Sequence, residues 1–227
     1  MDWKTKVDAG TLVKFTQSAG RVYADFDRPL TITSPPFVTA FPKLSREEVV
    51  KSQERGIRIT NYEIDINMTG AAEAQENFKS FMESLDEHLL AYVTITGAMG
   101  VSMGPQTYEY MQKRLFKTRR SNRTAREYPE GMNCRSKVSI ENADRFPVVD
   151  NNNNPYKEDI KPDDIVRVQL TYKGPYVIRS SCFGNSWELT AVQYCGHYEA
   201  PPPCFFPPDP SDFPTLPKWN SNTTGSA

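Results

Sequence analysis

The sequence predicts a mainly β fold, a small barrel or sandwich into which one or two helices are inserted. Three observations predict it. Apolar and polar residues alternate in the N-terminal third, a helical period replaces this alternation near residue 80, and the alternation returns after residue 164. The 227 residues suffice for one domain with a tail, and no segment repeats another.

Two parts of the N-terminal third have the pattern of β-strands. Residues 11–16 and 21–27 flank Ser18-Ala19-Gly20, a combination typical of a hairpin turn. Residues 57–68 alternate regularly enough to predict a half-buried strand, with a bulge at Asn61 where the alternation slips.

The middle of the chain changes to a helical period. Between residues 71 and 92 the apolar side chains recur every three or four positions, which places them on one face of a helix. These residues are Phe78, Phe81, Met82, Leu85, Leu89 and Tyr92. A second, shorter helical stretch is expected at about 105–118.

The alternation after residue 164 predicts three antiparallel strands that follow one another as a meander. We expect strands at 165–172, 176–179 and 187–194. The sequence Lys173-Gly174-Pro175 is expected to form the first turn between them, and residues 183–186 the second.

The C-terminal end differs in composition from everything before it. Eight prolines fall between Pro201 and Pro217, and such a segment neither donates to a sheet nor holds a helix. We therefore assign residues 1–198 to one domain and residues 199–227 to an extended or disordered tail. The aromatic residues of this tail leave two interpretations open, packing along its own domain or docking to a partner.

Composition excludes several classes of protein. The chain carries 27 basic and 28 acidic residues, so it is no polycation of the histone or ribosomal type. No apolar stretch approaches the roughly 18 residues that span a bilayer, and the N-terminus lacks the apolar core of a signal peptide. We expect a soluble, intracellular protein without a membrane partner.

Motifs for catalysis and for metal binding are absent from the sequence. There is no phosphate-binding loop, zinc-protease helix, nucleophile elbow or dinucleotide fingerprint. Glu63 and Asp65 share the polar face of their predicted strand, and Asp163-Asp164 is expected to close a turn. The Cys and His residues between 182 and 204 match no common zinc-finger spacing. We therefore expect no enzyme activity, no metal and no cofactor.

Positive charge is concentrated in one segment, residues 113–137, which we call the basic arm. It holds nine basic and two acidic residues, a net charge of +7 on a chain whose total is −1. Its cations are Lys113, Arg114, Lys117, Arg119, Arg120, Arg123, Arg126, Arg135 and Lys137. The arm is either a solvated loop or a phosphate-binding element, since Lys and Arg release counterions from a nucleic-acid backbone. We favour phosphate binding by the cations between Lys113 and Arg126.

Aromatic residues flank the basic arm and lie along the predicted meander. Proteins that bind single strands combine a positive groove with aromatic faces on which bases stack, at about 1–3 kcal/mol per base. The candidates for stacking are Tyr110, Phe116, Tyr172 and Tyr176. Trp187 alternates with Leu189 on the inward face of its predicted strand, so we expect a structural role for it.

One run of residues resembles a known family. Lys161-Pro162-Asp163-Asp164-Ile165-Val166 is followed by Leu170 to Gly174 and by Phe183-Gly184-Asn185-Ser186-Trp187-Glu188-Leu189. This run resembles the single-stranded DNA-binding proteins of phage T7 type and their relatives in nucleocytoplasmic large DNA viruses. The order of strands, amphipathic helix, basic connection and last strands is similar as well.

The resemblance implies an OB-fold-like antiparallel β-barrel with an inserted helix. It implies binding of single-stranded DNA without sequence specificity during viral or phage replication and recombination. It also implies a location in the cytoplasm or nucleus of an infected cell, with replication proteins as partners of the tail. The tail departs from the family pattern because it is Pro-rich rather than acidic.

Two questions stay open at the level of sequence, the function and the oligomeric state. A virion or other structural β-barrel protein is one alternative function, and a nucleotide-processing enzyme is another. The oligomeric state is not determined, and a homodimer is one alternative.

Overall fold

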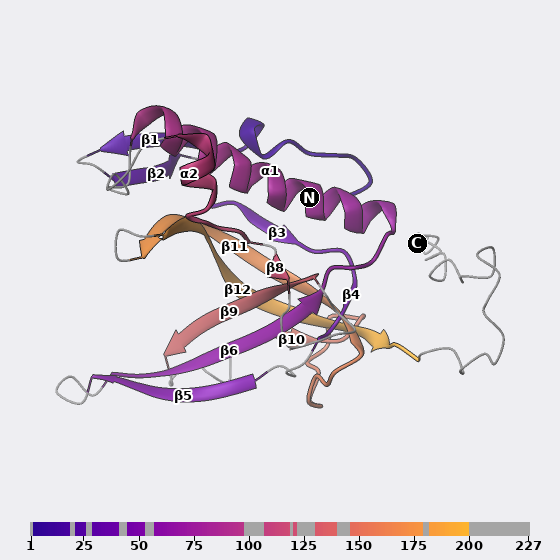
Figure 1. The fold of residues 1–227 in the computed structure, drawn as a ribbon. Helices are drawn as coiled ribbons and strands as arrows, with labels where there is room; N and C mark the ends of the chain where they lie inside the picture. The colour runs from indigo at the N-terminus through magenta and orange to yellow at the C-terminus, as the bar shows by residue number, and fades with distance from the viewer. Residues whose placement is uncertain are drawn as a thin grey trace, which may run out of the picture.

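In the computed structural model, the described residues form three sheets and one long helix (Figure 1). The described residues are 2–18, 21–25, 29–40, 45–52, 57–97, 107–118, 120–121, 130–139, 146–178 and 182–199. The tail predicted from residue 199 lies outside these ranges apart from its first residue, so the domain boundary stays a prediction.

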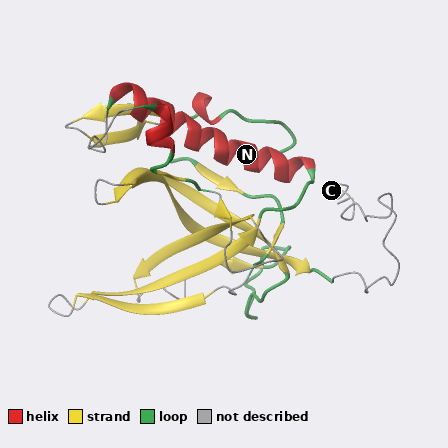
Figure 2. Cartoon of the chain, viewed as in Figure 1, coloured by secondary structure: helices red, strands yellow, loops and turns green. Residues whose placement is uncertain are grey.

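Two larger sheets make up the body of the fold (Figure 2). The six-stranded sheet has the order β10-β12-β11-β3, with β4 also paired to β11 and β7 to β12. Its strands are β3 Thr31–Thr33, β4 Phe37–Val38, β7 Leu115–Phe116, β10 Val148–Val149, β11 Asp164–Ile178 and β12 Cys182–His197. The four-stranded sheet has the order β5-β6-β9-β8, and its strands are β5 Ser45–Ser52, β6 Ile57–Asn67, β8 Arg120–Ser121 and β9 Glu130–Ser139.

The predicted fold class, mainly β with inserted helices, is confirmed. Among the described strands, hydrogen bonding does not join the two larger sheets into a closed barrel, so the barrel is an open one. The predicted N-terminal hairpin is also present, as β1 Lys14–Ser18 paired with β2 Arg21–Asp25. A single 3-10 turn, η1 Ala9–Thr11, precedes it.

Strand β6 confirms the alternation predicted for residues 57–68. Its even-numbered residues from 60 to 66 are buried, and the odd-numbered ones between them lie on the opposite face of the sheet. The bulge predicted at Asn61 is wrong, because Asn61 pairs in continuous register with both neighbouring strands. The register shift lies instead on β5, between Val50 and Ser52.

The meander predicted for the C-terminal half is a two-stranded hairpin. β11 and β12 pair from Asp164 with His197 to Ile178 with Cys182. Lys173-Gly174-Pro175 does not turn the chain, because Gly174, at φ 99°, takes up a register shift within β11. A bulge and a turn favour the same residue types, so composition did not distinguish them. The predicted second turn is likewise part of a strand, β12.

Helix α1, Glu73–Thr96, confirms the helical period predicted from residue 71. Gly97 ends it in the left-handed conformation, at φ 63°, and donates its N–H to the Val93 carbonyl over 3.0 Å. The helix predicted at 105–118 is confined, among the described residues, to α2, Tyr108–Gln112. The chain then pairs with β12 as β7, so tertiary pairing overrides the helical pattern.

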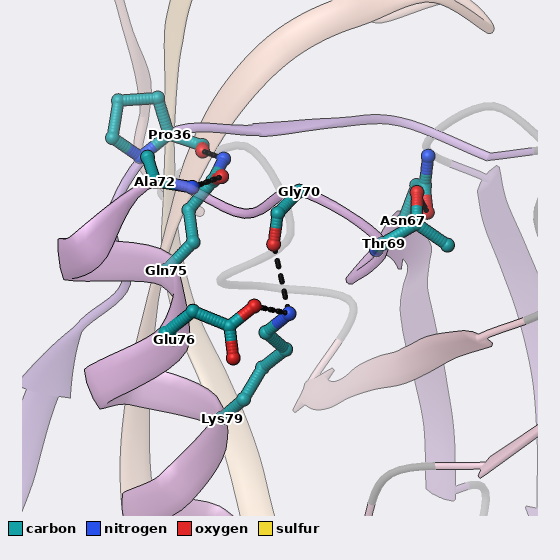
Figure 3. A network of polar contacts seen from close by, with 8 residues as sticks. All are labelled: Pro36, Asn67, Thr69, Gly70, Ala72, Gln75, Glu76 and Lys79. Atoms are coloured by element: carbon teal, nitrogen blue, oxygen red, sulfur yellow. Dashed lines mark hydrogen bonds and ion pairs between the residues drawn. The ribbon is translucent and has the colours of Figure 1, made fainter. Parts of the chain in front are cut away.

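A polar network fixes the N-terminal end of α1 (Figure 3). Gln75 accepts from the Ala72 N–H over 3.2 Å and donates to the Pro36 carbonyl over 2.7 Å. Lys79 is buried, and it donates to the Gly70 carbonyl over 2.8 Å. These bonds satisfy polar groups whose burial would otherwise be costly, and they tie the start of the helix to the segments around it.

The apolar face of α1 packs on the β11–β12 hairpin. Phe78, Phe81, Leu85 and Leu89 are buried, and the Phe81 ring centroid lies 6.5 Å from that of Trp187 on β12. Burial of each such side chain contributes about 1.5–3 kcal/mol, which holds the helix against this sheet. In Figure 1, α1 lies above the six-stranded sheet and the four-stranded sheet lies below it.

Within the ranges that the structure describes, no helix is long and apolar enough to span a membrane.

Candidate functional site

A groove of about 1220 Å³ lies between the two larger sheets. The polar wall, on β6 and β9, consists of Glu63, Asp65, Gly131, Met132, Asn133 and Arg135. The aromatic wall, on β11, β12 and the segment around the end of β7, consists of Phe116, Lys117, Thr118, Lys173, Tyr176, Ile178, Asn185, Ser186, Trp187 and Glu188. Segments distant in sequence therefore share one concavity, the usual location of a binding site.

On the polar wall, the side chains bond to one another. Asn133 Nδ2 donates to Glu63 Oε1 over 2.7 Å and to Asp65 Oδ1 over 2.5 Å. Arg135 Nη2 forms an ion pair with the same Glu63 oxygen over 2.9 Å. The sequence placed Glu63 and Asp65 on a polar strand face, and the structure shows that this face is one side of the groove.

On the aromatic wall, Phe116 and Tyr176 meet edge to face beside a glycine. Their ring centroids are 6.5 Å apart, with the planes at 71°. Gly184 of β12 pairs with Phe116 on one side and with Tyr176 on the other. A Cβ at Gly184 would stand 2.7 Å from the Phe116 carbonyl oxygen and 3.1 Å from the Tyr176 hydroxyl. Both aromatic residues can approach the β12 backbone because glycine has no side chain.

Trp187 lines the groove and also packs against residues of the core. Its ring centroid lies 5.0 Å from that of Tyr172 and 6.5 Å from that of Phe81, and the residue is half-buried. Its buried indole Nε1 has no hydrogen-bond partner within the described part of the chain. The packing agrees with the structural role expected for Trp187. Its place in the groove was missed, because alternation along a strand does not show which sheet lies opposite.

The charges that line the groove balance one another. Three cations and three carboxylates are present: Lys117, Lys173, Arg135, Glu63, Asp65 and Glu188. Lys173 Nζ lies 2.9 Å from Glu188 Oε2, so a second cation is paired as Arg135 is. Lys117 is exposed. A polyanion bound in this groove would therefore need further positive charge, which the rest of the basic arm can supply.

Three predicted site residues, Phe116, Lys117 and Tyr176, line the groove. Tyr172 requires a correction, because it is only 2% exposed and its hydroxyl donates to Asn185 Oδ1 over 2.6 Å inside the core. It has no face available to a base. The error came from the predicted turn at 173–175: since β11 continues through that region, Tyr172 falls on the buried face of the strand.

Three further predicted residues lie on or beside α2 and do not line the groove. The guanidinium carbon of Arg114 stands 4.5 Å from the centroid of the Tyr110 ring, and Arg114 Nη2 donates to the Tyr110 hydroxyl over 2.5 Å. Lys113, the C-terminal cap of α2, is exposed. The structure brings Tyr110 and Arg114 to one another, just before Phe116 in the chain.

The other predicted arginines of the basic arm are described in part or not at all. Arg120 pairs through its backbone with Gly131 of the polar wall, so the arm runs beside the groove at this point. Arg119, Arg123 and Arg126, and the side chain of Arg120, lie outside the described residues. Their phosphate contacts stay predictions.

The described residues include no cluster of three or more His, Cys, Asp or Glu side chains that could hold a metal ion. His197 Nδ1 lies 2.9 Å from Asp164 Oδ1. The other carboxylate oxygen of Asp164 accepts from the Lys161 N–H over 2.7 Å, which closes the turn predicted before β11.

Comparison with known proteins gives matches among solved structures. No protein-family model and no curated protein matches the chain. The chain is similar to the single-stranded DNA-binding protein encoded by bacteriophage T7, with 10% identity and a TM-score of 0.45 over 75% of this chain and 93% of that one. It is also similar to the single-stranded DNA-binding protein from bacteriophage Enc34 in complex with ssDNA, with 11% identity and a TM-score of 0.45 over 82% of this chain and 97% of that one.

Proposed function

We propose that this protein binds single-stranded DNA with little sequence preference and performs no chemistry on it. The observation that carries the proposal is the aromatic wall, where Phe116, Tyr176 and Trp187 line the groove beside Lys117 and Lys173. Aromatic rings stack on any base, and neighbouring cations neutralise the phosphates. A surface of this kind holds a strand without reading its sequence.

The arrangement favours an unpaired strand over a duplex. In a duplex the faces of the bases are covered by their neighbours, so side chains meet only phosphates, sugars and base edges. Stacking on Phe116 or Tyr176 requires a base that can leave its stack, and a base in a single strand does so at lower cost.

The basic arm is the proposed source of most phosphate contacts, because the charges of the groove lining balance. The backbone pairing of Arg120 with Gly131 supports a path of the arm along the groove. The proposed phosphate contacts are Lys113, Arg114, Lys117, Arg119, Arg120, Arg123 and Arg126. Phe116 and Tyr176 are the proposed stacking residues, with Tyr110 as a flanking aromatic.

The wider role rests on the family resemblance of the sequence and not on the geometry of the groove. We include in the proposal replication or recombination of viral or phage DNA in an infected cell, with the C-terminal tail contacting replication proteins. Assembly into shells or filaments without DNA would favour the alternative of a structural protein. An activity that is lost on chelation would favour the alternative of an enzyme.

Titration of a fluorescent oligo-dT with the full chain tests the stacking part. We expect Phe116→Ala and Tyr176→Ala each to weaken binding about 5- to 150-fold, which corresponds to ~1–3 kcal/mol of stacking per base. Tyr23→Ala is the matched control, because Tyr23 on β2 is 48% exposed and does not line the groove. Equal affinity for a duplex of the same length would contradict the proposal. A loss of affinity in Tyr23→Ala as large as in the two groove variants would contradict it as well.

The dependence on salt tests the phosphate contacts separately. Each cation that neutralises a phosphate of a single strand adds about 0.7 to the slope of log affinity against log salt concentration. Replacing Arg119, Arg120 and Arg123 together by Ala should therefore reduce the slope by about 2. An unchanged slope would show that these three arginines do not contact phosphates. It would leave the proposed stacking on the aromatic wall untouched.

A further inference from the structure

A buried carboxylate of α1 holds the chain at the start of the basic arm. Asp86 is 4% exposed, and its Oδ2 accepts from the Thr118 N–H over 2.7 Å. Its Oδ1 accepts from the Thr118 hydroxyl over 2.9 Å and from Asn185 Nδ2 over 2.8 Å. Three donors thus converge on one carboxylate, and bonds to a charged acceptor are about twice as strong as bonds between neutral groups.

A second layer of this network fixes the orientation of Asn185. The Tyr172 hydroxyl donates to Asn185 Oδ1 over 2.6 Å, so the amide nitrogen must turn toward Asp86. Burial raises the pKa of Tyr172, and the neighbouring Asp86 charge raises it further, so this hydroxyl remains a donor. The network therefore has one direction, from Tyr172 through Asn185 to Asp86.

Thr118 lies where the chain crosses from one sheet to the other. Phe116 pairs with β12 of the six-stranded sheet, and Arg120 pairs with β9 of the four-stranded sheet. Thr118 stands midway between them and lines the groove, directly after Lys117. The two hydrogen bonds that Thr118 donates to Asp86 therefore fix the middle of the segment that connects the two sheets.

We propose that Asp86 is a positioning residue for nucleic-acid binding, a role that rests on the function proposed above. By holding Thr118, it orients the crossing segment so that Phe116 and Lys117 face the bound strand. The sign of the effect separates this role from simple electrostatics. Asp86 places a negative charge behind a site for a polyanion, so charge alone predicts that its removal strengthens binding, whereas positioning predicts weaker binding.

The test compares Asp86→Ala with Val93→Ala, which changes a fully buried position of the same helix that does not line the groove. In oligo-dT titrations below the melting temperature of each variant, we expect about tenfold weaker binding for Asp86→Ala and less than about twofold change for Val93→Ala. The double variant Asp86→Asn with Asn185→Asp exchanges donor and acceptor between the two side chains. It rebuilds the bond between the two side chains with its direction reversed, and the Thr118 hydroxyl can turn to accept from the amide nitrogen that replaces Asp86 Oδ1. This double variant should restore affinity to within about threefold.

Binding by Asp86→Ala that equals or exceeds that of the unchanged protein would overturn the positioning role. If this variant does not fold, Thr118→Val replaces it, because that change removes only the hydroxyl donor. We then expect about threefold weaker binding, and unchanged binding would overturn the proposal. Failure of the unchanged protein to bind oligo-dT is a different result, which overturns the proposed function itself.

Discussion

The two walls of the groove differ in what their side chains contact. On the polar wall, Arg135 and Asn133 bond to carboxylates of the same wall. On the aromatic wall, Phe116 and Tyr176 lie against the backbone of β12 at Gly184, beside the exposed Lys117. Under the proposed function, this difference is a division of roles, in which the rings provide affinity for bases and the polar wall limits the positive charge that a polyanion meets.

The largest expected effect comes from adding a methyl group at Gly184, beside the aromatic wall. A Cβ at Gly184 would stand 2.7 Å from the Phe116 carbonyl oxygen, so Gly184→Ala must change the spacing between β7 and β12 and with it the position of Phe116 relative to β12. We expect an unfolding free energy lower by about 1–3 kcal/mol and an affinity for oligo-dT lower by about tenfold or more. Denaturant unfolding and the fluorescence titration measure the two quantities.

Gly131→Ala is the matched control on the polar wall. There the added Cβ meets the Ile66 carbonyl oxygen at 3.2 Å, a contact that a small shift relieves. The affinity for oligo-dT should change less than about threefold. An equal loss of affinity in Gly184→Ala and Gly131→Ala would contradict the proposed difference in role between the two walls.

A smaller effect, of opposite sign, is expected when the ion pairs of the groove are broken. Glu63→Gln releases Arg135, Glu188→Gln releases Lys173, and each change removes a negative charge from the groove. Because pairs at the surface are worth about 0–1 kcal/mol, we expect affinity for oligo-dT to rise about two- to fivefold, with a steeper salt dependence.

The control for these charge changes is Glu158→Gln, which removes the same charge at an exposed site outside the groove lining. Its affinity should stay close to that of the unchanged protein. Weaker binding by the Glu63 variant would show that this carboxylate assists binding and would contradict the role given to the polar wall, and weaker binding by the Glu188 variant would show the same for the ion pair of the aromatic wall.

The smallest expected effect concerns stability against pH. Burial raises the pKa of the Asp86 carboxyl, although bonds from Asn185 and Thr118 and the Lys117 charge partly offset this. The folded protein therefore keeps this proton to a higher pH than the unfolded chain does. The stabilising contribution is complete below the unfolded pKa of 3.8 and is lost as pH rises through the folded pKa.

Lowering the pH from 7 toward 4 should thus stabilise the unchanged protein relative to Asp86→Asn. Denaturant unfolding at each pH measures the difference. The prediction fails if the unfolding free energy of the unchanged protein falls relative to that of Asp86→Asn as the pH is lowered. That result would mean that the three hydrogen bonds lower the pKa of the carboxyl by more than its desolvation raises it.

Periodicity predicted the elements in which burial of one face imposes a spacing on the chain. The helix predicted from residue 71 and the strand at 57–68 were found for this reason. Lys173-Gly174-Pro175 was misread because glycine and proline serve bulges as well as turns. That single error placed Tyr172 beside a turn, and Tyr172 is buried whereas Tyr176 lines the groove.

The β class, the long helix and the concentration of cations after residue 113 follow from the sequence alone, because these depend on local spacing and composition. Which aromatic residues meet depends on how the chain packs in three dimensions. Phe116 reaches Tyr176 because β7 pairs with β12 at Gly184, a contact between segments far apart in the chain. Likewise, Arg135 is paired because β9 lies beside β6. Local patterns specify which face of an element is apolar, but the strand that lies alongside it depends on the packing of the whole chain.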